Sequence, residues 1–202
     1  MAATDGKRPA PATTRLAMLK WRPPPPLVTV LAVAALHGAY LLWTGQAIGP
    51  DSRTYAHWSE RLVASGFDYA GLAGQVNSEF PPLLYILFVT LLALLRLAFG
   101  EGWFAALFLL NFAAHVALAL LVVRMAARVT RSGIAGWAAL ILFLGCHDLV
   151  RWVRFVMSDT TFVLLAFSVF TLAAARILGE AKGWLRVAIP AAAGVFYRPT
   201  GM

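Results

Sequence analysis

The sequence contains little charge: Asp, Glu, Lys and Arg make up 13% of its 202 residues, while hydrophobic residues make up 60%. Soluble domains carry about 25% charged residues and are about 45–50% apolar. A composition this apolar excludes an ordinary soluble domain and predicts an integral membrane protein. The mean hydropathy of +0.74 agrees with that prediction.

Cysteine and the common catalytic motifs are also scarce. Cys146 is the single cysteine, so an internal disulfide is excluded. No spacing of His, Cys and Glu matches a zinc site. The phosphate-binding motifs G-x-x-x-x-G-K-[ST] and G-x-G-x-x-G and the nucleophile motif G-x-S-x-G do not occur. The sequence therefore gives no support for a nucleotide hydrolase or for a hydrolase with an activated serine.

Apolar runs dominate what is present, and a helix of roughly 20 apolar residues spans the bilayer hydrocarbon. Five runs are candidates: 27–43, 82–99, 103–123, 133–146 and 160–178. A sixth begins near Val187 and stops at Met202, so we expect a chain that continues in a longer protein. The predicted fold is an all-α, polytopic transmembrane helix bundle with a large extracytoplasmic first loop. We divide it into a basic, Pro-rich cytoplasmic tail, 1–26, and a transmembrane domain, 27–202.

A polar loop, Gly49–Pro81, lies between the first two runs and holds four of the nine acidic residues. The basic tail before the first run predicts that the N-terminus is cytoplasmic and that this loop lies outside. Within the loop, Tyr55, Trp58 and Leu62 are spaced by three and four positions. That spacing predicts a short amphipathic helix over Tyr55–Val63 that lies on the membrane surface.

The charges after residue 100 contradict a simple alternation of spans. Alternation places the arginines of 124–131 outside, against the positive-inside rule, and Asp159 inside. The cations of 176–186 mark the next loop as cytoplasmic, which requires Asp159 to lie outside. We therefore expect one run not to cross fully and select the shortest, 133–146, as a half-span or re-entrant segment. With that choice, the arginines of 124–131 still cannot lie inside while Asp159 lies outside.

Three polar islands carry the candidate functional residues: Gly49–His57, His147–Asp159 and Tyr197–Gly201. The catalytic candidates are Asp51 and Asp159, and the binding candidates are Tyr55, His57, Arg151, Arg154 and Arg198. Arginine forks bind phosphate through two parallel hydrogen bonds. A desolvated carboxylate can take a proton from an acceptor hydroxyl. The combination indicates chemistry on an anionic lipid phosphate.

Each of these residues also has a structural explanation. Asp51 and Asp159 can cap the helices that follow them. Arg151 and Arg154 can extend from a helix end towards the headgroup region. Arg198 lies inside an apolar run, where a charge is costly, so its presence favours a functional role. A divalent metal held by Asp51 and Asp159 is a further alternative.

Three other polar side chains fall within or at the end of apolar runs. For His37 and His115 we expect polar contacts between helices rather than ligand binding. Arg96, at the end of a run, is expected at the membrane interface.

The order of these motifs resembles the N-terminal half of the polytopic GT-C glycosyltransferases. It comprises an anchor helix, an outer loop opening GPDSRTY, the entry FPPLLYILFVTLL, the segment RFVMSDTTFVLLAFSVFTL and then FYRPTG. The nearest likeness is to bacterial family 39 and protein-O-mannosyltransferase-like enzymes, including the aminoarabinose transferases of lipid A. Asp51 matches the family's Asp after the first helix, Asp159 its second Asp, and Pro81–Tyr85 its PPLLY entry. Phe80 stands where the aminoarabinose transferases have a basic residue.

The resemblance implies an enzyme that moves a sugar from a polyprenyl-phosphate carrier to a lipid, glycan or protein acceptor on the extracytoplasmic side. It implies that Asp51 is the base, Asp159 a supporting carboxylate and Arg198 a contact of the lipid phosphate. It also implies a multi-pass protein of the cell (inner) membrane without nucleic-acid partners. Full enzymes of this kind are longer, so we expect residues 1–202 alone to insert into the membrane without transferring sugar.

Two other classes of protein remain as alternatives. The first is a non-catalytic membrane fragment or scaffold that keeps only the fold. The second is a small transporter, because buried Asp and Arg also suit ion paths. Transporters commonly contain internal repeats, and the segments 27–99 and 103–178 show no convincing repeat.

Overall fold

The structure is a computed structural model that describes residues 22–74, 85–177, 179 and 183–197. Within these residues the secondary structure is helical, which confirms the all-α part of the predicted fold. The tail before residue 22, the loop segment 75–84 and Arg198 lie outside the described residues.

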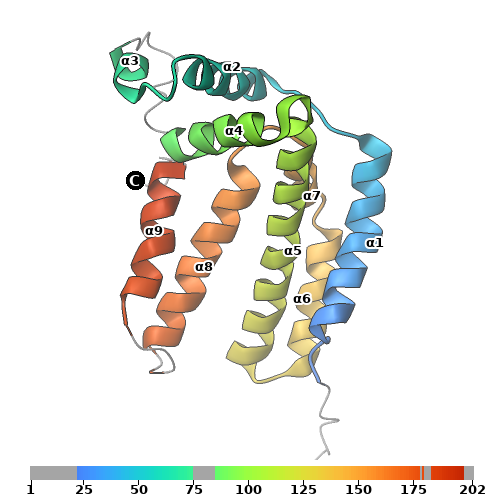
Figure 1. Ribbon diagram of the computed structural model, residues 1–202. Helices are drawn as coiled ribbons and strands as arrows, with labels where there is room; N and C mark the ends of the chain where they lie inside the picture. Colours follow the sequence, from blue (N-terminus) through green and yellow to red (C-terminus); the bar gives the residue numbers. More distant parts are fainter. Residues whose placement is uncertain (1–21, 75–84, 178, 180–182, 198–202) are drawn as a thin grey trace, which may run out of the picture.

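The helices form a bundle and a layer that lies across one end of it (Figure 1). The bundle helices are α1 Pro26–Thr44, α5 Trp103–Thr130, α6 Gly133–Gly145, α8 Asp159–Ile177 and α9 Leu185–Tyr197. The end-layer helices are α2 Pro50–Ala64, α3 Tyr69–Gly74 and α4 Ile86–Phe99. Three short helices lie in two of the connections: η2 Gly100–Gly102 between α4 and α5, and α7 His147–Arg151 followed by η3 Trp152–Arg154 between α6 and α8.

Three helical stretches in the described part of the chain are long and apolar enough to cross a membrane. They are Pro26–Thr44, Ile86–Thr130, which joins α4, η2 and α5, and Asp159–Ile177. A fourth is counted if α6 and its continuation through α7 and η3, bent by 57°, form one broken span. The same bend also fits a re-entrant loop, as predicted for 133–146. These lengths and compositions are compatible with a membrane protein.

Proline and glycine set the limits of the first two helices. Pro26 and Pro50 stand in the first turns of α1 and α2, where a missing N–H carries no penalty. Gly45 follows α1 and Gly66 lies just beyond α2, each with a φ of 65°, in the left-handed region that glycine enters without strain. The chain therefore leaves the bundle after α1, crosses its end as α2, and turns again.

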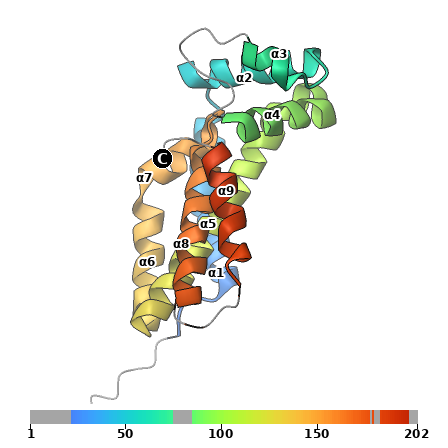
Figure 2. The ribbon, with the colours of Figure 1, turned by 90° about the vertical axis from the view of Figure 1, so that its left-hand side faces the viewer.

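Helix α2 confirms the amphipathic helix predicted over Tyr55–Val63. Tyr55 and Leu62 are buried, and Trp58 packs against the same apolar cluster. His57 and Glu60 are exposed. The helix lies across the end of the bundle (Figure 2), and its apolar stripe belongs to the same core cluster as residues of α4.

Helix α4 differs from the span predicted over 82–99. It lies across the bundle end beside α2 and at a large angle to α5 (Figures 1 and 2). Gly100, with a φ of 52°, ends α4, and η2 turns the chain into α5. Phe88 and Leu92 are fully buried, whereas Leu94 and Leu97 are more than half exposed. The apolar run therefore forms a helix that packs one face against the other helices and leaves the opposite face exposed.

Arg96 ties α4 to α2. Its Nε donates to Ser59 Oγ at 2.9 Å, and its Nη2 donates to the Ala56 carbonyl at 3.3 Å. The guanidinium also lies 4.1 Å from the centre of the Trp103 ring at the start of α5, a distance at which the cation is attracted to the aromatic face. The side chain predicted to be interfacial therefore fixes the corner between α2, α4 and α5.

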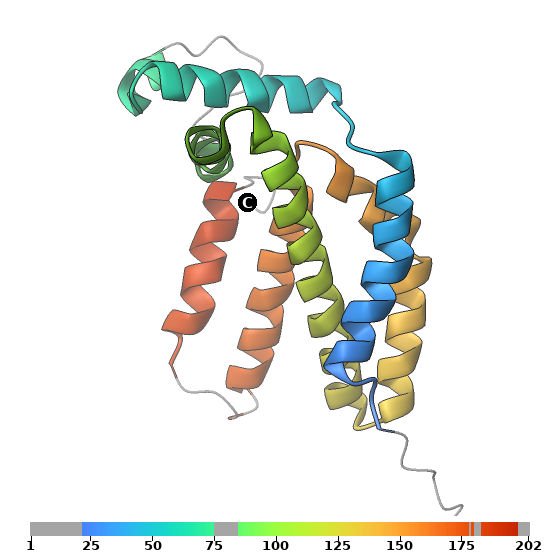
Figure 3. The ribbon, with the colours of Figure 1, turned by 45° about the vertical axis from the view of Figure 1, so that its right-hand side comes forward.

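Of the two ends of the bundle seen in Figure 3, only one carries described acids, whereas arginines occur at both. The described acids all belong to elements at the α2–α4 end: Asp51, Glu60, Asp68, Glu101, Asp148 and Asp159. The described basic residues at the opposite end are Arg22, Arg124, Arg128, Arg131, Arg176 and Arg186. The end that holds α2 and α4 is hereafter the acidic end, and the other is the arginine end.

A buried histidine pair joins three bundle helices. His37 of α1 and His115 of α5 have their Nδ1 and Nε2 atoms 2.7 Å apart, and His37 Nε2 lies 3.0 Å from the Leu144 carbonyl of α6. A carbonyl only accepts, so His37 donates from Nε2, and in the neutral pair its Nδ1 accepts from His115. The prediction that these histidines make contacts between helices is confirmed.

Candidate functional site

The two candidate carboxylates follow two connections that pair with each other. Ala47, between α1 and α2, and Phe155, between η3 and α8, form a parallel bridge. The Ala47 amide donates to the Arg154 carbonyl at 3.0 Å. Asp51 follows Ala47 by four positions, and Asp159 follows Phe155 by the same interval. The bridge therefore brings the starts of α2 and α8, each with an acid in its first turn, to the acidic end.

Two further side chains hold this bridge in place. Arg154 donates from Nη2 to the Thr44 carbonyl, at the end of α1, at 2.8 Å. Asn111, fully buried in α5, donates from Nδ2 to the Phe155 carbonyl at 3.4 Å. A cation at a helix C-terminus is favourable, so Arg154 has a structural role in addition to the binding role suggested by the sequence.

Asp51 is not the cap of α2. The cap residue is Gly49, without a side-chain cap hydrogen bond, and Asp51 is exposed inside the first turn. A negative charge in that turn interacts favourably with the helix dipole, but the helix begins without needing this carboxylate as a cap. Asp159 is half-buried as the first residue of α8.

The binding candidates divide into packed and open side chains. Tyr55 is 5% exposed and its ring centre lies 5.2 Å from that of Tyr85 and 5.0 Å from that of Phe88, so its ring belongs to the apolar core beneath α2. His57 is exposed on α2, and Arg151 is exposed at the end of α7. The structure thus brings Asp51, Arg154 and Asp159 to one region and places Tyr55 in the packing below it.

Several buried polar atoms near the acidic end have no hydrogen-bond partner among the described residues. They include Ser52 Oγ in the first turn of α2, Asn111 Oδ1, Thr160 Oγ1 in the first turn of α8, and Arg154 Nε. An unsatisfied buried polar group costs about 1–3 kcal/mol, so a polar partner for any of these atoms would stabilise the structure. Sequence reasoning missed Asn111, although an amide in the middle of the run 103–123 was a visible signal.

No group of three or more His, Cys, Asp and Glu side chains in the described ranges could hold a metal ion. A magnesium ion can be held by one or two carboxylates together with substrate phosphates. The alternative of a divalent metal between Asp51 and Asp159 therefore stays a prediction that needs the substrate as a further ligand.

No family model matches the sequence, and no curated protein or solved structure matches it either. The resemblance to GT-C glycosyltransferases consequently rests on the motifs and their order in the chain.

Proposed function

We propose that this chain is part of a membrane glycosyltransferase that uses a polyprenyl-phosphate sugar as donor. The proposed site lies at the acidic end. The observation that carries the proposal is the bridge between Ala47 and Phe155, which gives Asp51 and Asp159 equivalent positions at the starts of two helices. The unpartnered polar atoms of Ser52, Asn111 and Thr160 lie in the same elements or against the same bridge. The order of sequence motifs supplies the class of reaction.

The proposed reaction is a direct displacement at the anomeric carbon of the sugar. Asp51, which is exposed, takes the proton of the acceptor hydroxyl as the acceptor oxygen attacks that carbon. The bond between the carbon and the phosphate oxygen breaks, and polyprenyl phosphate leaves with the electron pair. A cation such as the exposed Arg151 stabilises the charge that develops on the leaving phosphate. Asp159 supports the site from the start of α8.

The proposed orientation places the acidic end outside and the arginine end in the cytoplasm. With α4 lying across the bundle end (Figure 1), α1 runs outwards, α5 inwards, α6 outwards and α8 inwards. The arginines of 124–131 then lie inside and Asp159 outside, so one alternation removes the conflict between these two segments. In this arrangement α4, rather than the run 133–146, is the apolar segment that does not cross.

Cysteine labelling tests the orientation. In a Cys146→Ala background, Ser65→Cys, beyond α2, is expected to react with a membrane-impermeant maleimide in intact cells. Arg131→Cys, at the end of α5, is expected to react only after permeabilisation, since both positions are exposed but at opposite ends. The reverse pattern, or labelling of both positions in intact cells, would overturn the orientation and with it the outward-facing site.

The function itself is tested in membranes from cells that express the gene at its own locus, so that any natural partner or continuation of the chain is present. Radiolabelled polyprenyl-phosphate sugars, differing in sugar, are added to these membranes and to membranes from a deletion strain. The expected result is transfer of one sugar to an endogenous acceptor, with release of polyprenyl phosphate, only where the gene is present. Equal transfer in both membranes for every donor would favour the scaffold alternative.

A further inference from the structure

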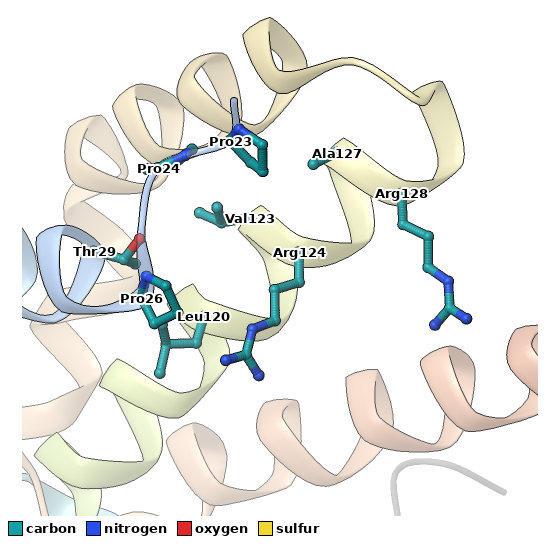
Figure 4. A pocket seen from close by; sticks show the side chains of 9 residues that line it. All are labelled: Pro23, Pro24, Pro26, Thr29, Leu120, Val123, Arg124, Ala127 and Arg128. Carbon is teal, nitrogen blue, oxygen red and sulfur yellow. The ribbon is translucent and has the colours of Figure 1, made fainter. Parts of the chain in front are cut away.

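Two cavities at the arginine end share Arg124 as a lining residue. The smaller, about 380 Å³, lies between the Pro23–Pro26 segment and α5 and is lined by Leu120, Arg124 and Arg128 among others (Figure 4). The larger, about 660 Å³, is lined by residues of α5, α8 and α9. Arg124 lines both. Leu120 also lines both, so Arg124 is the charged residue that the two cavities share.

We propose that the groove between α5, α8 and α9 binds an anionic phospholipid of the adjacent leaflet. The phosphate of the lipid contacts Arg124 and Arg186, and an acyl chain lies along the groove. Basic pockets between transmembrane helices are known to take anionic lipid headgroups. The proposal concerns the arginine end and does not depend on sugar transfer at the acidic end.

The lining of the groove suits an acyl chain. Leucines of α5 and α8 and Ile189 of α9 supply most of its wall, and Ser168 is its uncharged polar side chain. The volume falls within the range of about 300–1,000 Å³ typical of small-molecule sites. The leucine-lined part of the groove suits an acyl chain, because water would find few polar partners there.

The charges at the groove select an anionic headgroup. Arg124 and Arg186 are both exposed and line the groove, and no acid lines either cavity in the part of the chain that the structure describes. Figure 4 shows Arg124 and Arg128, one helical turn apart, projecting from α5 in the same direction. Each arginine near a membrane surface is expected to raise affinity for an anionic lipid about fivefold. A zwitterionic headgroup gains little from this arrangement, so the site distinguishes the two.

Native mass spectrometry of the purified chain tests the proposal. The protein is delipidated in detergent and titrated with phosphatidylglycerol or with phosphatidylcholine of the same acyl chains. We expect one phosphatidylglycerol to bind about tenfold more tightly than phosphatidylcholine. Arg124→Gln is expected to remove about fivefold of that preference. The matched control is Arg131→Gln, which removes the same charge from the same helix end but lines neither cavity, and it is expected to retain the preference.

Three results would overturn the proposal. An unchanged preference in Arg124→Gln would remove the arginine from the site, and an equal loss in Arg131→Gln would reduce the effect to non-specific attraction. Displacement of the lipid by millimolar inorganic phosphate would assign the site to a free anion. Leu165→Trp fills the groove without changing charge, and it should weaken both lipids. If Arg124→Gln does not fold, Arg186→Gln provides the same comparison from α9.

Discussion

Replacing Asp51 by asparagine is expected to lower sugar transfer by about 10²–10⁴-fold, the usual contribution of a positioned general base. The side chain keeps its shape but no longer accepts the proton of the acceptor hydroxyl. Since Gly49 caps α2 without a side-chain hydrogen bond, the substitution should leave the helix and the fold intact. The loss should therefore appear in turnover, while donor binding changes little. Single-turnover transfer and donor-binding measurements in the same membranes separate the two.

Glu60→Gln is the matched control for this substitution. Glu60 is an exposed acid on α2, three turns of helix away from the start of that helix, and it lies outside the bridged region. Its conversion removes the same charge and should leave transfer within about twofold, because surface substitutions away from a site have small effects. Near-normal turnover in Asp51→Asn would limit Asp51 to an electrostatic role at the start of α2.

Replacing His37 by leucine is expected to destabilise the bundle by about 1–2 kcal/mol. The substitution removes the bonds to His115 and to the Leu144 carbonyl and leaves both groups buried. Hydrogen bonds between membrane helices contribute about 0.6 kcal/mol on average and up to about 1.7, and a stranded buried group adds its own penalty. For a chain of this size the melting temperature in detergent should fall by about 2–8 °C.

A double-mutant cycle and a surface control make this prediction specific. His115→Leu in the His37→Leu background should cost less than His115→Leu alone, because the stranded partner is then removed as well. His147→Leu breaks an exposed bond, 3.0 Å long, to Tyr40 Oη on the same helix α1. It is expected to change stability by less than about 0.5 kcal/mol. Additive losses for His37 and His115 would show that the pair contributes no coupling.

Sequence patterns predicted the elements that depend on neighbouring residues. The apolar run 27–43 predicted α1, and the spacing of Tyr55, Trp58 and Leu62 predicted the buried stripe of α2. These features follow from local hydropathy and from helical periodicity. They needed no knowledge of the rest of the chain.

The path of α4 was not predictable in the same way. Hydropathy describes the run 82–99 alone, whereas the position of α4 depends on contacts with other helices, such as Arg96 with Ser59. The conflict between the arginines of 124–131 and Asp159 indicated that one run does not cross. The sequence analysis chose 133–146 because it is the shortest run. Periodicity and hydropathy alone do not distinguish an apolar helix that packs across the end of a bundle, such as α4, from one that spans the bilayer.

The candidate site was predictable only in part for a similar reason. Asp51 and Asp159 are identifiable as acids beside apolar runs, but the pairing of Ala47 with Phe155 leaves no trace in composition or periodicity. The structural role of Arg154 and the burial of Asn111 appear only once the two connections are seen together. Sequence therefore suggested which residues to consider, and the tertiary contacts show how they are held.

The link between Thr44 and Arg154 also constrains the order of events during synthesis, because these residues are 110 positions apart in the chain. A ribosome that adds about 5–20 residues per second needs roughly 5–20 s to make the intervening segment. During that interval the nascent chain holds the complete α1 and α2 but lacks Phe155, the bridge partner of Ala47, and the cation at the end of α1. The bridge and the contact of Arg154 with Thr44 therefore form only after the second of the two connections has been translated.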